Sequence, residues 1–314
     1  METILELNNL TKSFGKRRII DGISLKINSG EVVGFLGPNG SGKTTTIKLI
    51  TGLLFPDSGD VKICGYDLKS NFEEAVANLG AIVENPDMYK QFSGRRNLEM
   101  AARIHGGISG SRIEEVIDIV GLRARIDDKV KKYSLGMKQR LGVALAILNK
   151  PRLLIFDEPT NGLDPKGIKE FREIVKNAAH KDGAAVFVSS HMMSEMQLMC
   201  DRVAIVEHGR LIGMEDVAAV VDGAESTYYK IIVSDAVAAE NIINVDLGDV
   251  IKEVSGSPIA NGSAASITFA VTVDGVPGLV RRLTESGVGI YAVQPVGSSL
   301  EDAFINITGG SGIE

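Results

Sequence analysis

Residues 32–51 read VVGFLGPNGSGKTTTIKLIT, and this stretch decides how the N-terminal part of the chain folds. It begins with a short apolar run, 32–36, which has the length and composition of a buried strand. It ends with 44–51, which is typical of a helix and is closed by Gly52. Between them lies the pattern G-x-x-x-x-G-K-[ST], which binds nucleotide phosphates when it joins a strand to a helix. An accidental match is the alternative in a chain with 35 glycines, but the flanking strand and helix favour a phosphate-binding loop.

The residue types of this loop explain how it would hold phosphate. Glycines let the loop curl so that successive backbone N–H groups point at phosphate oxygens. The helix that follows directs its positive N-terminal end at the same anion. Lys43 supplies a mobile cation for the β- and γ-phosphates, and the Thr44 hydroxyl can ligate Mg²⁺. The residues expected to contact the nucleotide here are Gly37, Pro38, Asn39, Gly40, Ser41, Gly42, Lys43, Thr44 and Thr45.

Two carboxylates follow a second apolar run, which is predicted as a buried strand over 152–156. Asp157 and Glu158 come directly after it. Because parallel strands end at the same edge of a sheet, Asp157 is expected beside the phosphate loop, where it would hold Mg²⁺. Glu158 points differently and is expected to reach the water that attacks the γ-phosphate. Taken alone, the pair could equally be a solvated turn before Pro159; the phosphate loop favours the functional interpretation.

The composition limits the kinds of partner. The chain is 44% hydrophobic and 24% charged, as globular proteins are. Its net charge of −6 and its lack of Trp argue against nucleic-acid binding, and the basic run Lys129, Lys131 and Lys132 is interpreted as a solvated face. Cys64 and Cys200 lack metal-ligand spacing, so free thiols in a reducing compartment are expected. No apolar stretch reaches the ~18–20 residues that span a bilayer, and the first ten residues are too polar for a signal peptide.

The fold class predicted for residues 1–216 is α/β. Short β-rich runs, including 184–189, alternate with helical patterns, which predicts a parallel sheet covered by helices on both faces. Residues 86–150 are mostly helical and predict a helical subdomain, with an amphipathic helix at 112–120 and a second helix opening at Ser134. One face of that second helix is expected to carry Met137, Leu141, Ala144, Leu145 and Leu148.

The remainder of the chain predicts a second, smaller domain. Residues 217–226 are interpreted as a linker. Residues 227–314 follow the order βαββαβ, which predicts a small two-layer α+β domain of the ferredoxin-like type. The tail at 309–314 is expected to be frayed.

A third motif, YSLGMKQR at 133–140, connects these features. Ser134 is a good helix N-cap, and a helix N-terminus with a free hydroxyl is also an anion site. The order of the phosphate loop, this segment, FDEPTNGLD at 156–164 and then His191 resembles that of ATP-binding-cassette (ABC) ATPases over about residues 2–215. The resemblance implies a P-loop ATPase that uses ATP and Mg²⁺ and powers a separate transmembrane permease.

The resemblance also implies a composite site. In this family the signature segment of one subunit meets the phosphate loop of another, so Ser134 and Gly136 are expected to contact the γ-phosphate in trans, in a homodimer or a heterodimer. Phe14 resembles the aromatic residue that stacks on adenine. Asp164 matches the loop that couples the two sites. His191 resembles the histidine that contacts the γ-phosphate and orients the attacking water.

Two departures from the family's usual sequences are informative. The signature segment usually reads Leu-Ser-Gly-Gly-Gln, and this chain differs at Tyr133, Leu135 and Met137. Glu84 stands where the family has a Gln that ligates Mg²⁺, and a carboxylate can still do so. The Glu-Asn-Pro sequence at 84–86, with the stretch 299–304, resembles bacitracin-resistance and lantibiotic-immunity transporters, which implies a role in export of, or immunity to, peptide antibiotics.

Two other functions are weighed against this one. A non-transport ABC ATPase of the DNA-repair or translation type is disfavoured because the chain has no long heptad insertion, second cassette or basic surface signal. A P-loop small-molecule kinase is disfavoured by the segment 133–140 and by His191. The favoured interpretation places the chain on the cytoplasmic face of the cell membrane, in contact with it only through the permease, whose predicted contact is near Glu84 and 87–93.

Overall fold

The computed structural model describes residues 2–84, 86–222, 227–248, 250–256, 265–271 and 273–296. The chain divides into two compact units between Val217 and Ala218, and each unit is described by itself. Asn85, the stretch 299–304 and the tail 309–314, on which sequence predictions were made, lie outside the described residues.

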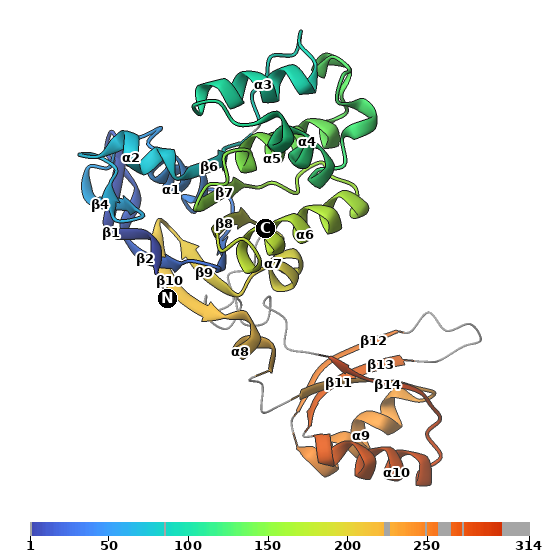
Figure 1. Cartoon of the computed structure of the whole chain (residues 1–314). Coiled ribbons are helices and arrows are strands. Elements are labelled where there is room, and N and C mark those ends of the chain that lie inside the picture. Colours follow the sequence, from blue (N-terminus) through green and yellow to red (C-terminus); the bar gives the residue numbers. More distant parts are fainter. Residues whose placement is uncertain are drawn as a thin grey trace. The chain divides into compact units, whose positions relative to one another are not determined.

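A six-stranded sheet forms the centre of the first unit (Figure 1). Five of its strands are parallel, and β10 pairs antiparallel at one edge. The strands predicted at 32–36, 152–156 and 184–189 are confirmed as its central members. In sheet order the strands are β10 (Arg210–Asp216), β9 (Arg202–Glu207), β3 (Val32–Leu36), β8 (Ala185–Ser190), β7 (Leu153–Asp157) and β6 (Leu79–Ile82).

One face of this sheet is covered by a second sheet as well as by a helix, so the prediction of helices on both faces is incomplete there. A second, antiparallel sheet shares one apolar core with helix α1 (Lys43–Ile50) and with alternate residues of the parallel strands. Its two long strands bury Leu5, Leu7, Ile23 and Leu25, because alternate residues of a strand lie on the same face. In order, its strands are β2 (Arg17–Asn28), β1 (Thr3–Phe14), β4 (Ser58–Ile63) and β5 (Tyr66–Asp67).

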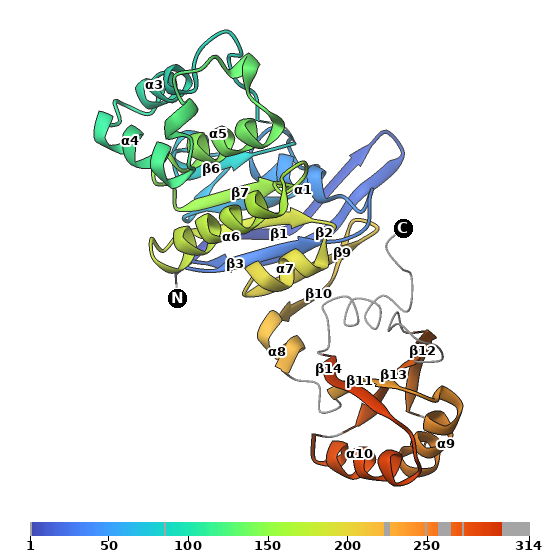
Figure 2. The same cartoon turned by 90° about the vertical axis from the view of Figure 1, so that its right-hand side faces the viewer.

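The opposite face of the parallel sheet is covered by α6 (Pro165–His180) and α7 (Met193–Met199), as Figure 2 shows. The ring of Phe156 on β7 meets that of Phe171 on α6 edge-on, with centroids 5.2 Å apart. Gly34 on β3 leaves room for α7, because a Cβ there would lie 3.2 Å from the Met196 sulfur.

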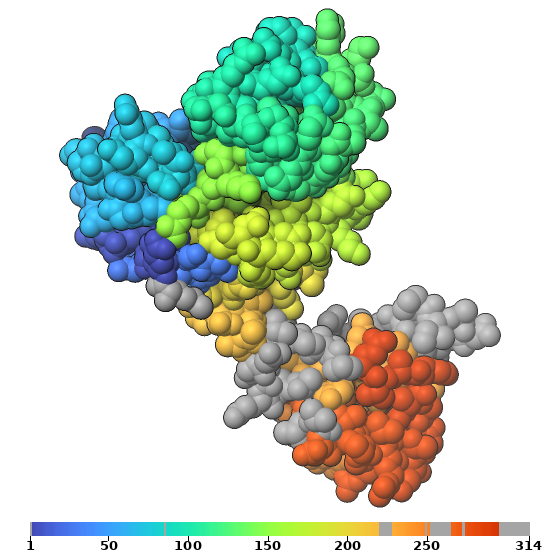
Figure 3. Space-filling view, viewed as in Figure 1, coloured from blue at the N-terminus to red at the C-terminus, as the bar shows by residue number. Residues whose placement is uncertain are grey.

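The predicted helical subdomain is a separate lobe of the first unit (Figures 1 and 3). Its last helix contacts α3, α4 and β6. The prediction of a single apolar face on that helix is therefore incomplete, because Gly142, Val143, Ala146 and Ile147 are buried along with Leu141. The helices that follow β6 are α3 (Gly94–Ile104), α4 (Gly110–Ile119), η1 (Arg123–Arg125), η2 (Val130–Lys132) and α5 (Leu135–Ile147). Helix α2 (Phe72–Ala77) comes directly before β6.

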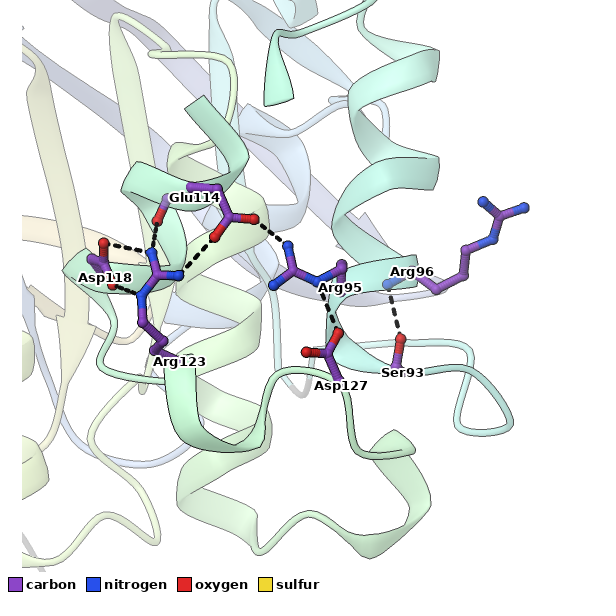
Figure 4. Close-up of polar contacts among 7 residues, drawn as sticks. All are labelled: Ser93, Arg95, Arg96, Glu114, Asp118, Arg123 and Asp127. Carbon is purple, nitrogen blue, oxygen red and sulfur yellow. Dashed lines mark hydrogen bonds and ion pairs between the residues drawn. The ribbon is translucent and has the colours of Figure 1, made fainter. Parts of the chain in front are cut away.

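A cluster of ion pairs holds α3, α4 and η1 together (Figure 4). Glu114 on α4 pairs with Arg95 on α3 and, at 2.8 Å, with Arg123 on η1. Arg95 also pairs with Asp127 at 2.8 Å, and Arg123 pairs with Asp118. The cluster thus braces the segment that leads into α5.

Replacing Glu114 should destabilise the protein at neutral pH only. Hydrogen bonds from Arg95 and then Arg123 lower the pKa of the Glu114 carboxyl below its usual value. A lowered pKa in the folded state gives stability that is present above the ordinary glutamate range and is lost as the pH falls through the folded-state pKa. We expect Glu114→Gln to lower Tm at pH 7 and to lower it progressively less as the pH falls below the ordinary glutamate range. Glu73→Gln, an exposed change on α2, is the control; a Tm difference for Glu114→Gln that is constant with pH would contradict the prediction.

The second unit has the βαββαβ order that was predicted. Its four strands form one antiparallel sheet in the order β12-β13-β11-β14, as in a ferredoxin-like arrangement. Ile231, Ile267 and Phe269 of the sheet pack with Ile243 and Leu283 of the helices. The elements are β11 (Thr227–Val233), α9 (Ala236–Leu247), β12 (Ile251–Gly256), β13 (Ala265–Val271), η3 (Val273–Gly275), α10 (Val276–Glu285) and β14 (Ile290–Val296).

The segment 217–226, predicted as a linker, contains a short helix, α8 (Val217–Asp222). Ala218 and Ala219 favour a helix in this stretch, because alanine has the highest helical propensity.

Candidate functional site

The phosphate-binding loop has the shape that its glycines predict. It leaves β3 and enters α1, whose N-cap is Gly42 with φ of +106°, a conformation that residues with a Cβ rarely adopt. Gly37 sits so close to β9 that a Cβ would lie 2.2 Å from the Val206 carbonyl oxygen. The loop therefore depends on glycine at both positions, and the strand–loop–helix context that the motif requires is confirmed.

Lys43 lies inside this loop, with only 7% of its side chain exposed. Its ammonium donates hydrogen bonds to the carbonyl oxygens of Gly37 at 2.7 Å and Pro38 at 3.2 Å. It also lies 3.8 Å from a carboxylate oxygen of Glu158. Burial lowers the pKa of Lys43, and the charges of Glu158 and Asp157 oppose that shift. The loop thus holds a desolvated cation that an incoming phosphate can use.

The two carboxylates at the end of β7 have different environments. Asp157 is 1% exposed and accepts a hydrogen bond from the Ser189 hydroxyl at 2.6 Å. Glu158 has a positive φ of +49°, and its N–H donates to the Ser189 carbonyl and hydroxyl oxygens. This turn directs the Glu158 side chain to His191, whose Nδ1 lies 2.8 Å from Glu158 Oε2. The structure therefore brings together the acid and the histidine that the sequence predicted.

Ser189 is a residue of the site that the sequence analysis did not single out. It is the next-to-last residue of β8, the neighbour of β7, and the parallel pairing places it opposite Asp157. Its position directly before the Ser190-His191 pair was the available signal.

A pocket of about 440 Å³ joins the loop to Phe14 and Glu158. Phe14, at the end of β1, is 51% exposed and free to meet a planar base. Arg17 and Ile19 of β2 also line the pocket, and the sequence analysis missed both because they are near Phe14 only through the β1–β2 pairing. The lining residues are Phe14, Arg17, Ile19, Asn39, Gly40, Gly42, Lys43, Thr44, Thr45 and Glu158.

The signature segment and Asp164 lie outside this pocket. Ser134 caps α5 by accepting the Met137 N–H at 3.3 Å, and Asp164 caps α6 by accepting the Gly167 N–H at 2.9 Å. Gly136 lies in the first turn of α5. These residues hold helix ends in this chain, which leaves their predicted contact with nucleotide to a second subunit.

The signature helix is joined to the loop that follows Glu158. Gln139 of α5 donates to the Pro159 carbonyl at 3.0 Å, and both groups are buried. Gly162 packs against Leu135, where a Cβ would lie 2.1 Å from the leucine Cδ2. Direct contacts thus connect the loop after Glu158 to α5.

Glu84 lies in a different setting from the one expected. Its carboxylate pairs with Lys48 of α1 at 2.6 Å, its side chain is 59% exposed, and its φ is +58°. It does not line the pocket. No sequence motif indicated that Lys48 would be the partner of Glu84.

The residues present fit a magnesium ion that is shared with a nucleotide. Thr44 offers a hydroxyl and Asp157 a buried carboxylate, the hard oxygen donors that Mg²⁺ prefers. Among the described residues there is no group of three or more acidic, histidine or cysteine side chains that could hold a metal ion by themselves.

Comparison with known proteins agrees with this geometry. Residues 20–161 match the family described as ABC transporter. The chain is 44% identical to the uncharacterized ABC transporter ATP-binding protein YhcH of Bacillus subtilis (strain 168), over 98% of this chain and 97% of that protein. It is 34% identical to the bacitracin transport ATP-binding protein BcrA of Enterococcus faecalis, over 100% and 99% of the two chains.

A solved structure extends the comparison to the fold. The ATP-binding cassette MJ0796, determined as a dimer in a post-hydrolysis state bound to ADP and Pi, superposes with a TM-score of 0.63 at 25% identity and covers 68% of this chain and 99% of its own. Together with the full-length relatives, it shows that this chain belongs to the family of ABC transporter ATP-binding proteins, the subunits that bind and hydrolyse ATP.

Proposed function

We propose that the pocket beside Lys43 is the ATP site and that each residue there has a defined task. Phe14 stacks on adenine, Lys43 and the loop N–H groups hold the β- and γ-phosphates, and Glu158 polarises the attacking water. His191 holds that water in line. The observation that carries the proposal is the 2.8 Å contact between His191 and Glu158 at the mouth of the phosphate loop, with Glu158 also 3.8 Å from Lys43.

The proposed magnesium site uses Thr44 and Asp157. When bound, Mg²⁺ would neutralise negative charge on the phosphate oxygens. Ser189 positions Asp157 by its 2.6 Å hydrogen bond. Glu84 would join the ion only after leaving Lys48, to which it is bound at 2.6 Å.

The proposed working state is a dimer in which Ser134 and Gly136 of one subunit meet the γ-phosphate held by another. Both residues lie at the exposed N-terminal end of α5, where N–H groups attract an anion. The dimeric assembly of the MJ0796 cassette supports this arrangement. Asp164, at the start of α6, would couple the two sites.

Two substitutions separate the capping role of Ser134 from its proposed contact with phosphate. Ser134→Asp preserves an N-cap, because Asp caps helices as well as Ser does, but it places a negative charge against the γ-phosphate. We expect Ser134→Asp to keep the wild-type Tm, to lower ATPase activity by about 10²-fold and to abolish dimerisation in MgATP, measured by light scattering.

The matched control is Ser109, which caps α4 in the same way by accepting the Arg112 N–H at 3.3 Å. Ser109→Asp should likewise keep the wild-type Tm, and it should leave ATPase activity and dimerisation intact. Dimerisation of Ser134→Asp at the wild-type level would rule out the contact in trans.

The proposed partner is a transmembrane permease, which would hold this subunit at the cytoplasmic face of the membrane. In the described part of the chain, no helix is both long and apolar enough to cross a bilayer. The contact is placed near Glu84 and residues 87–93, where Tyr89 and Phe92 are exposed. We expect the tagged subunit to co-purify with a polytopic membrane protein. Tyr89→Glu should weaken that co-purification, because it places a charge at the proposed contact.

The proposed cargo is a peptide antibiotic, exported from the cell or cleared from its surface. Support comes from the full-length match to the bacitracin transport protein BcrA. A strain that lacks this subunit should be more sensitive to bacitracin or a lantibiotic, and the wild-type gene, but not one encoding Glu158→Gln, should restore resistance. Unchanged sensitivity to all such peptides would reject this cargo class while leaving the ATPase assignment intact.

We also propose residues 1–216 as the ATPase domain, 217–226 as its connection and 227–314 as an accessory domain. The division of contacts between Val217 and Ala218 supports this boundary. The comparisons favour neither the DNA-repair or translation alternative nor the kinase alternative.

A further inference from the structure

Arg17 is a basic side chain that lines the nucleotide pocket and has no role in the proposed binding of adenine, terminal phosphates or Mg²⁺. It begins β2 and pairs directly with Phe14 at the end of β1, across the turn at residues 15–16. Side chains that face each other on paired strands have Cβ atoms about 4.5–5.5 Å apart. The Arg17 side chain therefore starts next to the Phe14 ring.

The alternation of side chains along β2 shows that Arg17 is directed to the pocket. Arg17 and Ile19 line the pocket, whereas Arg18 between them does not. Arg18 instead pairs with Asp21 at 2.8 Å. Because successive side chains of a strand point to opposite faces, the two neighbouring arginines serve different surfaces.

The other basic side chains near the pocket have partners, whereas Arg17 has none among the described residues. Lys43 is engaged by two carbonyl oxygens and by Glu158. Lys12, which lies 5.7 Å from the centre of the Phe14 ring, is paired with Asp57 at 3.0 Å. Within the described residues, the guanidinium of Arg17 makes no hydrogen bond or ion pair, so its N–H donors are available to a ligand.

We propose that Arg17 binds the α-phosphate of the nucleotide held by the same subunit. The inference rests on the proposed ATP site. A nucleotide with its base on Phe14 and its terminal phosphates at Lys43 must place its sugar and α-phosphate between these two residues, beside Arg17. A guanidinium fits this position because it binds phosphate oxygens through two parallel N–H groups.

The test is the affinity for ADP, which lacks the γ-phosphate and so reports on one subunit rather than on dimer closure. By titration calorimetry of the full chain, Arg17→Ala should bind ADP about 5- to 10-fold more weakly, with an unchanged Tm. Arg17→Lys should keep part of that affinity. Arg18→Ala, the adjacent residue on the opposite face, should bind ADP as the wild type does.

Different bases distinguish a phosphate contact from a base contact. If Arg17 binds the α-phosphate, Arg17→Ala should weaken ADP, GDP and CDP by the same factor, and the loss should shrink as salt is raised. A factor that differs among the three bases, or an unchanged ADP affinity, would overturn the inference. Lys43→Met tests the site itself: if that variant loses ADP while Arg17→Ala does not, only the role of Arg17 is rejected.

Discussion

Glu158→Gln should bind ATP but hydrolyse it about 10²- to 10⁴-fold more slowly than the wild type. The substitution keeps the size of the side chain and a group that can contact His191, which lies 2.8 Å from the glutamate. It removes the negative charge that polarises water. Because ATP then persists between the subunits, the variant should accumulate as a dimer in MgATP, seen by light scattering, and should dissociate in MgADP.

A second substitution tests whether Glu158 and His191 act as a unit. His191→Ala alone should also slow turnover, but combining it with Glu158→Gln should slow it little further, because residues that share one step are not additive. Glu173→Gln, an exposed change on α6, should leave turnover unchanged. A Glu158→Gln enzyme within twofold of wild-type turnover would remove Glu158 from the catalytic role.

The parts of the fold that were predicted correctly are those written locally in the sequence. The strand, loop and helix around Lys43 depend on an apolar run, glycines and a helical stretch that follow one another directly. The strand that ends at Asp157 was recognised because its apolar residues also follow one another directly, and all five of its residues are buried. The βαββαβ order of the second unit followed from strand and helix patterns of ordinary length.

The parts that were missed depend on contacts between distant segments. The antiparallel sheet, which shares one face with helix α1, was missed because β1 pairs with β4 as well as with β2. No local sequence pattern shows that pairing. Arg17 enters the pocket through the same hairpin. The Lys48–Glu84 pair joins residues 36 apart, and a motif comparison places Glu84 only by its alignment with a glutamine.

Lys43→Met should remove about half or more of the stabilisation of the protein by ATP without unfolding the nucleotide-free protein. Burial lowers the pKa of Lys43, which means that the folded state disfavours its charge more than Glu158 and Asp157 favour it. For a base, this cost is present in full at pH values below the lowered pKa. Met removes the cost but leaves the Gly37 and Pro38 carbonyls without their donor. Because the two effects oppose each other, the Tm without nucleotide should change by only a few degrees.

The effect on binding has no such compensation. Charged hydrogen bonds to phosphate are each worth about 1.5–3 kcal/mol, so the affinity for ATP should fall about 10- to 100-fold. At ATP concentrations a hundred times the wild-type Kd, the nucleotide stabilises the wild type by about 2.7 kcal/mol, a variant with a tenfold higher Kd by about 1.4 kcal/mol and one with a hundredfold higher Kd by about 0.4 kcal/mol. The increase in Tm on adding MgATP should therefore fall by about half or more in Lys43→Met and persist in Lys26→Met, where the replaced lysine pairs with Glu6 on the antiparallel sheet. A full ATP-induced increase in Lys43→Met would mean that the nucleotide is held elsewhere. Among the described residues that line the pocket, Lys43 supplies the only buried positive charge.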